Sequence, residues 1–368
     1  MIELKRKELG LQSRLTNETF KFDERYGNGY FSASNFLKTE KIIKDNFPDA
    51  MVTMQFFTRK PSVLCGVDEA IALLHTFARN PENLKIEALN DGDEVSPMEP
   101  VLKVHGRYQD FGYLEGAIDG ILARRTSVCT NCSELMKVKS PNSNVMFFGD
   151  RDDDPINHKG DGYAAYVAGI KLVCSDAMGE WTGLQGIGTM PHALIIMHEK
   201  DLIAASEDFH RAFPNDNLTV LVDTNNDVIT DTLLVARHFK EKLFGVRVDT
   251  SISLVDKYFE RNPINDPNVE TRGVNVTLIK ALRKALDDEG FNHVKIVVSS
   301  GFTAEKVALF TKENAPVDTY GVGGSLIKCT RSFTGDVVNI NGKAMAKEGR
   351  KEMFSDRLKK VSYPIMVK

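Results

Sequence analysis

The chain has 368 residues, of which 42% are hydrophobic and 27% charged, and its formal net charge is −4. This composition predicts a globular protein of about two domains and argues against a surface that binds nucleic acid. No apolar run approaches the roughly 20 residues of a membrane-spanning helix, and the charged amino terminus contains no signal-peptide core. The five cysteines, an odd number, fit reduced thiols better than disulfides. We therefore expect a cytoplasmic protein of the size of an enzyme.

Residues 1–115 predict an N-terminal α/β domain built from short strands and helices. Residues 34–46 have the spacing of an amphipathic helix, residues 50–58 alternate as a strand does, and residues 68–79 begin with acids, which suits a helix N-terminus. We expect the Lys-rich tail, residues 327–368, to return to this domain. The second domain then comprises residues 116–326.

The second domain alternates between predicted helices and apolar strands. Residues 113–138 predict one long helix, residues 144–149 a strand, and residues 164–173 a closely packed helix. Four later apolar runs end in polar residues or glycine, as buried parallel strands do: 218–223, 243–251, 294–301 and 317–324. Helices are expected after three of them, over residues 227–242, 274–289 and 304–314. This order predicts an irregular β/α barrel, whose chemistry lies at the carboxyl ends of its strands.

Glycine and serine follow the last two predicted strands. Gly323, Gly324 and Ser325 come directly after one strand, and Ser300 and Gly301 end the other. Backbone N–H groups in such loops converge on anions, and phosphate sites are frequent at the last strands of barrels. A tight turn without a ligand is the alternative for one loop alone. The two loops together favour a phosphate site.

Two acids, Asp223 and Asp249, end strands of neighbouring units. Paired carboxylates at such an edge can hold Mg²⁺ or ribose hydroxyls, or stabilise a cationic transition state. A helix cap or an ion pair is the alternative for either acid alone. Arg247 lies inside an apolar strand, where a buried guanidinium needs a partner. Further arginines beside predicted strand or helix ends are Arg124, Arg125 and Arg151.

His192 follows a glycine-rich loop and a proline, and it precedes an apolar run that we expect to be a strand. A histidine in this position is either a catalytic group or a hydrogen-bonded core residue, and the residues alone leave both open. Cys129 and Cys132 form a CxxC pair inside the long predicted helix. A zinc site needs four ligands and no second pair follows, so we expect no structural zinc.

Several short motifs, taken in order, resemble those of the nicotinate phosphoribosyltransferase family, which is related to the nicotinamide and quinolinate phosphoribosyltransferases. The similarity covers about residues 35–325 and is greatest to the shorter, archaeal-type members. No single motif is decisive, but their order is specific. The motifs include FLKT at 36–39, LCGVDEAIALL at 64–74, FFGDR at 147–151, GTMPHALI at 188–195, VRVDTS at 246–251, VSSGF at 298–302 and YGVGGSL at 320–326.

The resemblance implies a type II phosphoribosyltransferase fold, in which an irregular barrel is joined to an N-terminal α+β sandwich domain. It implies a homodimer with shared active sites. The implied reaction converts nicotinate and 5-phosphoribosyl-1-pyrophosphate into nicotinate mononucleotide and pyrophosphate, in NAD salvage. ATP is the implied co-substrate, hydrolysed through a phosphohistidine, and Mg²⁺ is expected to enter with the pyrophosphate rather than to be held by the protein alone.

The resemblance also implies roles for residues at matching motif positions. His192 corresponds to the phosphorylated histidine, Phe148 to a ring that stacks on the pyridine, and Arg151 to a substrate contact. Arg247 and Asp249 would face the ribose and the base, and Asp249 is also the candidate Mg²⁺ ligand. The remaining candidates are Asp223 near the developing cation, Ser300, Gly301, Gly323, Gly324 and Ser325 for the 5′-phosphate, and Lys38, Thr39 and Arg125 for the pyrophosphate part of the substrate.

Several positions depart from the family pattern. Asp150 and Asp152 flank Arg151 where the family usually has small or basic residues, and Asn35 stands where many members have a tyrosine. Asp176 lies where nicotinate enzymes tend to have uncharged residues and nicotinamide enzymes an acid. An acid at this position would repel the carboxylate of nicotinate. The sequence therefore leaves the choice of substrate base open between nicotinate and nicotinamide, and we prefer nicotinate on overall similarity. A quinolinate enzyme and a non-catalytic barrel that binds a phosphorylated metabolite also stay open on the sequence alone.

Overall fold

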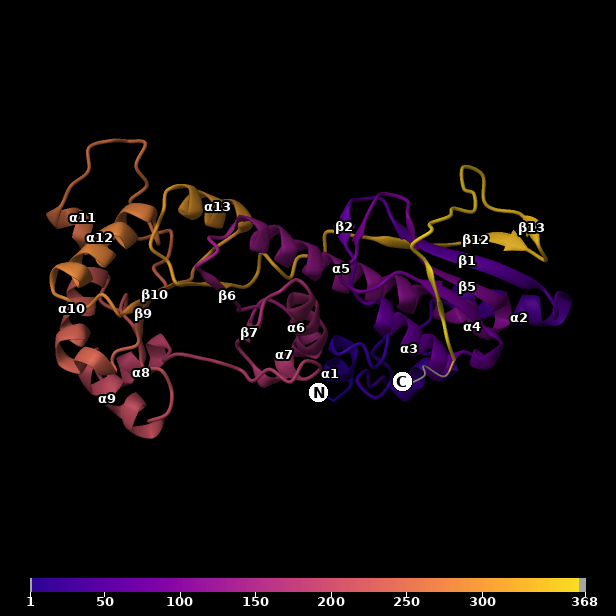
Figure 1. Cartoon of the computed structure of the whole chain (residues 1–368), viewed down its shortest axis with the longest axis horizontal. Helices are drawn as coiled ribbons and strands as arrows, with labels where there is room; N and C mark the ends of the chain where they lie inside the picture. Colours follow the sequence, from indigo (N-terminus) through magenta and orange to yellow (C-terminus); the bar gives the residue numbers. More distant parts are fainter. Residues whose placement is uncertain (1, 364–368) are drawn as a thin grey trace.

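The computed structural model describes residues 2–363 of the chain. Figure 1 shows an elongated molecule with a sheet toward each end and the long helix α5 (Glu115–Val138) between the two sheets. The other helices are α1 (Ile2–Glu8), α2 (Ser34–Asn46), α3 (Val67–Phe77), α4 (Tyr108–Phe111), α6 (His158–Val167), α7 (Asp176–Gly179), α8 (His192–Met197), α9 (Leu202–Ala212), α10 (Val228–Phe239), α11 (Lys257–Arg261), α12 (Val276–Asp288) and α13 (Ala304–Lys312).

One sheet is antiparallel and has six strands in the order β13-β12-β1-β5-β3-β14. Its central strand β1 (Met51–Thr58) confirms the strand expected from alternation at 50–58. β1 pairs with β5 (Pro100–Arg107) on one side and with β12 (Phe333–Ile340) on the other. Segments from both ends of the chain therefore build this sheet. Its outer strands are β3 (Lys85–Ala88), β13 (Lys343–Ala344) and β14 (Lys359–Val361), and a separate small ladder joins β2 (Ser62–Val63) to β4 (Glu94–Val95).

The other sheet is parallel and has six strands in the order β7-β6-β11-β10-β9-β8. Val246 of β9 stands opposite Val220 of β8 and Ile296 of β10, so the apolar runs pair in register. The strands are β6 (Asn144–Phe147), β7 (Leu172–Val173), β8 (Thr219–Leu221), β9 (Gly245–Val248), β10 (Lys295–Val298) and β11 (Thr319–Val322).

The parallel sheet is open among the described residues, so the structure confirms the expected α/β fold but not the irregular barrel. β7 and β8 are its two edges and do not pair with each other in the described part of the chain. The segment between them forms α7, α8 and α9 rather than a strand that would bridge the gap. The fold class is α/β, with the carboxyl ends of parallel strands gathered at one edge.

Two local predictions were wrong. Residues 164–173 divide between the end of α6 and the strand β7, because Gly169 takes a left-handed conformation with φ 98° and ends the helix. The apolar run after His192 is the helix α8, not a strand. Only Ile195 of that run is fully buried, whereas Met197 is 81% exposed. Periodicity alone does not distinguish a helix from a strand in so short an apolar run.

Two hydrophobic cores lie behind the two sheets, and α5 contributes to both. Ile118 and Leu122 pack into the core of the antiparallel sheet, while Val128 and Leu135 pack into the core of the parallel sheet. Each fully buried aliphatic side chain stabilises a fold by about 1.5–3 kcal/mol. The helix therefore couples the two halves of the molecule. No helix among residues 2–363 is long and apolar enough to cross a membrane.

Candidate active site at the carboxyl ends of the parallel strands

The structure gathers an aromatic ring and three polar side chains at the carboxyl ends of the parallel strands, as their sequence positions predict. Phe148 directly follows β6, Asp223 follows β8, Asp249 follows β9 and Ser299 follows β10. Because parallel strands point the same way, these four positions lie at one edge of the sheet. This edge is where ligands bind in open α/β sheets.

Arg247 on β9 is the central cation of this edge. Its Nη1 donates a hydrogen bond to Thr189 Oγ1 at 2.9 Å, and its Nη2 lies 3.9 Å from Asp249 Oδ2. Its guanidinium carbon lies 6.0 Å from the centre of the Phe148 ring. Burial lowers the pKa of Arg247. The negative charges of Asp249 and Asp223 oppose this shift, and the positive charge of Arg151 adds to it.

The Nε atom of Arg247 is buried and has no hydrogen-bond partner among residues 2–363. A buried donor without a partner is unfavourable, so it is suited to a ligand that brings an acceptor. The sequence predicted that this guanidinium needs a partner, and the structure supplies Thr189 for one of its nitrogens only. Thr189 was not identified from the sequence; its place in the GTMPH motif was the available signal.

Asp249 is held in place by Ser299, which precedes the predicted phosphate residues Ser300 and Gly301 and whose contact with Asp249 was not predicted. The Ser299 hydroxyl donates to Asp249 Oδ1 at 2.6 Å, and Ser299 is only 4% exposed. The other carboxylate oxygen, Oδ2, makes only the 3.9 Å approach to Arg247 within the described chain. One oxygen of Asp249 is therefore fixed and the other remains available.

His192 and Asp223 form a pair beside Arg247. His192 begins α8 after Pro191, and its Nε2 lies 3.2 Å from Asp223 Oδ1. The Asp223 side chain is 7% exposed and the His192 ring 39% exposed. Burial raises the pKa of Asp223, with His192 opposing the shift and Asp249 adding to it. When Nε2–H donates to the carboxylate, Nδ1 carries the free lone pair and can act as a nucleophile or base.

The predicted phosphate loops lie close to Phe148. A Cβ atom on Gly321 would fall 2.6 Å from the Phe148 ring, and one on Gly323 would fall 2.3 Å from the Phe148 carbonyl oxygen. Ser300 and Gly301 both have positive φ, 76° and 65°, and a Cβ on Gly301 would meet open space. The loops therefore present backbone rather than side chains at this edge.

Two side chains at these loops do not favour an anion. The Ser325 hydroxyl donates to the Phe302 carbonyl at 2.9 Å, so it is already engaged within the protein. The Asp152 carboxylate lies close to Gly323 and Gly324, 3.0 Å and 3.1 Å from the points where their Cβ atoms would stand. A negative charge therefore lies beside the glycines.

Arg124 and Arg125 are engaged in buried ion pairs on α5. Arg125 donates to both oxygens of Glu69 at 2.8 Å and 3.1 Å, and Arg124 binds Asp161 and also pairs with Asp153. A Cβ on Gly160 would overlap the Arg125 guanidinium, so the glycine provides the space it occupies. The partners of the two arginines are thus Glu69, Asp153 and Asp161. Neither arginine pairs with the carboxylates that follow β8 and β9.

The remaining predicted residues lie elsewhere on the molecule. Lys38 and Thr39 belong to α2, which Figure 1 places at the opposite end from α8. Asp176 begins α7, and its carboxylate accepts a hydrogen bond from Gly186 N at 2.8 Å. Arg151 follows β6 and lies near enough to Arg247 to influence its pKa.

The comparisons with known proteins point to pyridine phosphoribosyltransferases. The model of the family "Quinolinate phosphoribosyl transferase, N-terminal domain" matches residues 33–126. A nicotinate phosphoribosyltransferase of Bacillus subtilis is 22% identical over 245 residues, which are 65% of this chain and 45% of that protein. The nicotinate phosphoribosyltransferase pncB2 of Mycobacterium tuberculosis is 30% identical over 165 residues, 44% of this chain and 31% of that protein. The chain thus spans less than half of the length of these two curated relatives.

Solved structures extend the similarity over most of the chain. A nicotinate-nucleotide pyrophosphorylase from Pyrococcus furiosus matches with a TM-score of 0.77 and 29% identity, over 90% of this chain and 81% of that one. Human nicotinic acid phosphoribosyltransferase matches in fold with a TM-score of 0.65 and 16% identity, over 85% of this chain and 75% of that one. Taken together, these findings show that the chain is similar in sequence to nicotinate phosphoribosyltransferases over part of its length, and that its fold resembles that of the solved nicotinate-nucleotide pyrophosphorylase and nicotinic acid phosphoribosyltransferase over most of it.

Proposed function

We propose that the protein is a nicotinate phosphoribosyltransferase, which joins nicotinate to the ribose of 5-phosphoribosyl-1-pyrophosphate and releases pyrophosphate. One observation carries the proposal. The pair His192–Asp223 lies beside the group Arg247–Asp249, and Phe148 shares their edge of the sheet. The curated relatives named nicotinate phosphoribosyltransferases support the same assignment.

The carboxylates suit the charge that develops in this reaction. Departure of pyrophosphate leaves an oxocarbenium-like ribose, and preorganised negative charge stabilises such a transition state. Asp249, with one oxygen held by Ser299, would face the ribose. The unpartnered Nε of Arg247 would donate to a substrate oxygen, and the Phe148 ring would stack on the pyridine.

The 5′-phosphate would lie on the backbone of the two loops, Ser300–Gly301 and Gly323–Ser325. Converging N–H groups bind such an anion without a side-chain cation. Because the Ser325 hydroxyl is engaged with Phe302, the main chain of Ser325 would make the contact. Asp152 would oppose the phosphate charge at this position, and Arg151, one residue before it, would offset that effect.

His192 would couple ATP hydrolysis to the transfer. With Nε2 held by Asp223, Nδ1 would attack the γ-phosphorus of ATP, ADP would leave, and the phosphorylated imidazole would later lose its phosphoryl group to water. Mg²⁺ in such sites is held by one or two carboxylates together with substrate phosphates. Residues 2–363 contain no group of three His, Cys, Asp or Glu placed to hold a metal by themselves. Asp249 fits as the single protein ligand, and the ion would neutralise charge on the leaving pyrophosphate.

A quinolinate phosphoribosyltransferase is the second candidate, favoured by the family model that matches residues 33–126. A dicarboxylate substrate needs more free cations than nicotinate does. Arg124 and Arg125 are instead paired with Asp161 and Glu69, which favours the monocarboxylate. Nicotinamide is less favoured because the Asp176 carboxylate is engaged by Gly186 N.

The proposal includes an assembly. Lys38 and Thr39 lie on α2, at the other end of the molecule from α8, so they would reach substrate in the active site of a second subunit of a homodimer. We infer two domains, residues 1–115 with 327–368 and residues 116–326, and we regard the open parallel sheet as the wall of an irregular barrel. A cytoplasmic location belongs to the same proposal.

The test is product formation from phosphoribosyl pyrophosphate and Mg²⁺ with nicotinate, nicotinamide or quinolinate, each with and without ATP. We expect turnover of nicotinate alone, accelerated by ATP. Turnover of quinolinate would establish the second candidate. Binding of phosphoribosyl pyrophosphate without pyrophosphate release from any base would instead identify a non-catalytic binding protein.

A further inference from the structure

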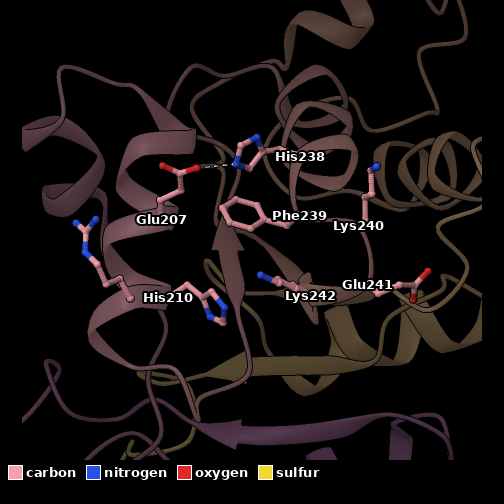
Figure 2. A pocket seen from close by; sticks show the side chains of 8 residues that line it. Glu207, His210, His238, Phe239, Lys240, Glu241 and Lys242 are labelled. Atoms are coloured by element: carbon pink, nitrogen blue, oxygen red, sulfur yellow. Dashed lines mark hydrogen bonds and ion pairs between the residues drawn. The ribbon is translucent and has the colours of Figure 1, made fainter.

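A cavity lies at the opposite end of β8 and β9 from Asp223 and Asp249. It has a volume of about 530 Å³ and forms where α9 and α10 end and a short 3₁₀ turn, η5 (Lys240–Lys242), leads into β9. The four residues of β9 separate the cavity from the candidate active site. Figure 2 shows the side chains that line it.

The cavity is lined by three cationic side chains, Lys240, Lys242 and Arg211, and by two acids, Glu207 and Glu241. His238 Nε2 lies 2.8 Å from Glu207 Oε1, as the dashed line in Figure 2 marks, and Glu241 faces His293 at 3.8 Å. The ammonium groups of Lys240 and Lys242 make no ion pair or hydrogen bond with any residue between 2 and 363. Glu207 is therefore engaged by a histidine ring, whereas the two ammonium groups have no acid partner within the described chain.

A third group in the cavity lacks a partner. The Nδ1 atom of His210, on α9, is buried and makes no hydrogen bond within the described chain. His210 and Lys242 both line the cavity, and Figure 2 shows their side chains. A ligand with several acceptor oxygens would satisfy both groups, whereas a cation would be repelled and an apolar ligand would leave them unsatisfied.

We propose that this cavity binds the phosphate group of a small phosphorylated metabolite or free inorganic phosphate. Lys242 and Lys240 supply the charge, and the His210 ring donates one hydrogen bond. A phosphate is favoured over a carboxylate because it carries about 1.5–2 negative charges and three acceptor oxygens. The site is independent of the proposed transferase activity, because none of its residues belongs to the edge that holds Asp223 and Asp249.

The test uses the whole protein labelled with ¹⁵N in its histidine rings, eight in all. The His210 resonance is identified by its loss in His210→Gln. Inorganic phosphate and ribose 5-phosphate are titrated separately to about 10 mM, tenfold above a millimolar Kd, against sodium chloride of equal ionic strength. We expect phosphate, and not chloride, to shift the His210 resonance saturably. A lower Kd for ribose 5-phosphate would identify a phosphate ester as the ligand, and equal Kd values free phosphate.

Lys242→Gln should weaken this binding about tenfold, the effect of losing one charge-assisted hydrogen bond. The matched control is Lys284→Gln, on α12, which removes an exposed lysine paired with Asp288 and should leave the Kd unchanged. A His210 resonance that does not move with either probe, or an equal weakening by both substitutions, would overturn the proposal. Phosphate binding at the glycine loops does not confuse the result, because the His210 ring reports only on its own cavity.

Discussion

Ser299 is the residue that fixes the orientation of Asp249, since its hydroxyl donates to Oδ1 at 2.6 Å in a buried position. In Ser299→Ala the carboxylate is free to rotate away from the position proposed for the ribose. We expect kcat to fall about tenfold, the order of a hydrogen bond to a charged group, with a much smaller change in KM. Ser299→Thr retains the hydroxyl and should restore most of kcat. Equal kcat in the alanine variant and the wild type would show that Asp249 is positioned without this contact.

In the proposed mechanism, ATP coupling depends on His192. In His192→Ala we expect ATP hydrolysis to disappear while a slow, ATP-independent transfer remains, because the carboxylates and Arg247 are left in place. Asp223→Asn tests the orientation of the ring, since it keeps the size of the side chain but removes its charge. It should lower ATPase by about 10²–10⁴-fold, the usual contribution of a general acid–base pair. Unchanged ATPase in His192→Ala would contradict the assignment.

At the scale of elements, the end of α10 shows a conformation that its sequence does not favour. Lys240, the residue after the helix, has φ 50°, a left-handed value that glycine adopts without strain. Lys240→Gly should therefore raise the free energy of unfolding by about 0.5–1 kcal/mol, measured by urea denaturation. Lys240→Ala removes the same side chain but keeps the strained backbone, so it should give no gain. A similar gain in both variants would mean that the side chain, not the backbone, is responsible.

Helices and strands were predictable from the sequence where a pattern of neighbouring residues determines them. The apolar strands and their polar ends follow from the local pattern of a buried parallel strand, and β8 to β11 lie where that pattern places them. The helix α8 was not predictable, because an apolar run of five residues fits either a helix or a strand. The open edge between β7 and β8 depends on packing between distant segments, which no local pattern records.

Contacts between side chains that lie far apart in the sequence were likewise not predictable. The sequence indicated that Arg247 needs a partner, but it did not indicate that Thr189, 58 residues away, provides it. Arg125 was predicted to contact the pyrophosphate part of the substrate because the family resemblance implies this role. Its pairing with Glu69, 56 residues away, becomes visible only when α3 and α5 are packed together.

At the scale of the whole molecule, a cluster of carboxyl groups lies where the C-terminal strand β12 meets α5. Glu115 and Asp119 stand one turn apart on the helix, and Asp336 on β12 faces them with Arg350 as its ion-pair partner. Burial raises the pKa of Glu115 to about 8, with Asp119 and Asp336 adding to the shift. Burial likewise raises the pKa of Asp119 to about 6, opposed by the hydrogen bond from Gly335 N. This contact joins β12 to the helix that spans both cores.

The raised pKa makes the stability of this junction depend on pH. The folded state keeps the Glu115 proton up to a pH of about 8, whereas the unfolded chain loses it near its ordinary value of 4.5. The unfolded state therefore binds fewer protons in this window, and stability falls as the pH rises through it. Glu115→Gln stays neutral and should gain about 1–2 kcal/mol over the wild type at a pH of about 8.5, after discounting for partial exposure, and almost nothing at a pH of about 4.5. Urea midpoints at both pH values measure this difference, with the 90% exposed Glu241→Gln as the control. Parallel pH profiles for Glu115→Gln and the wild type would mean that Glu115 is already ionised in the folded protein.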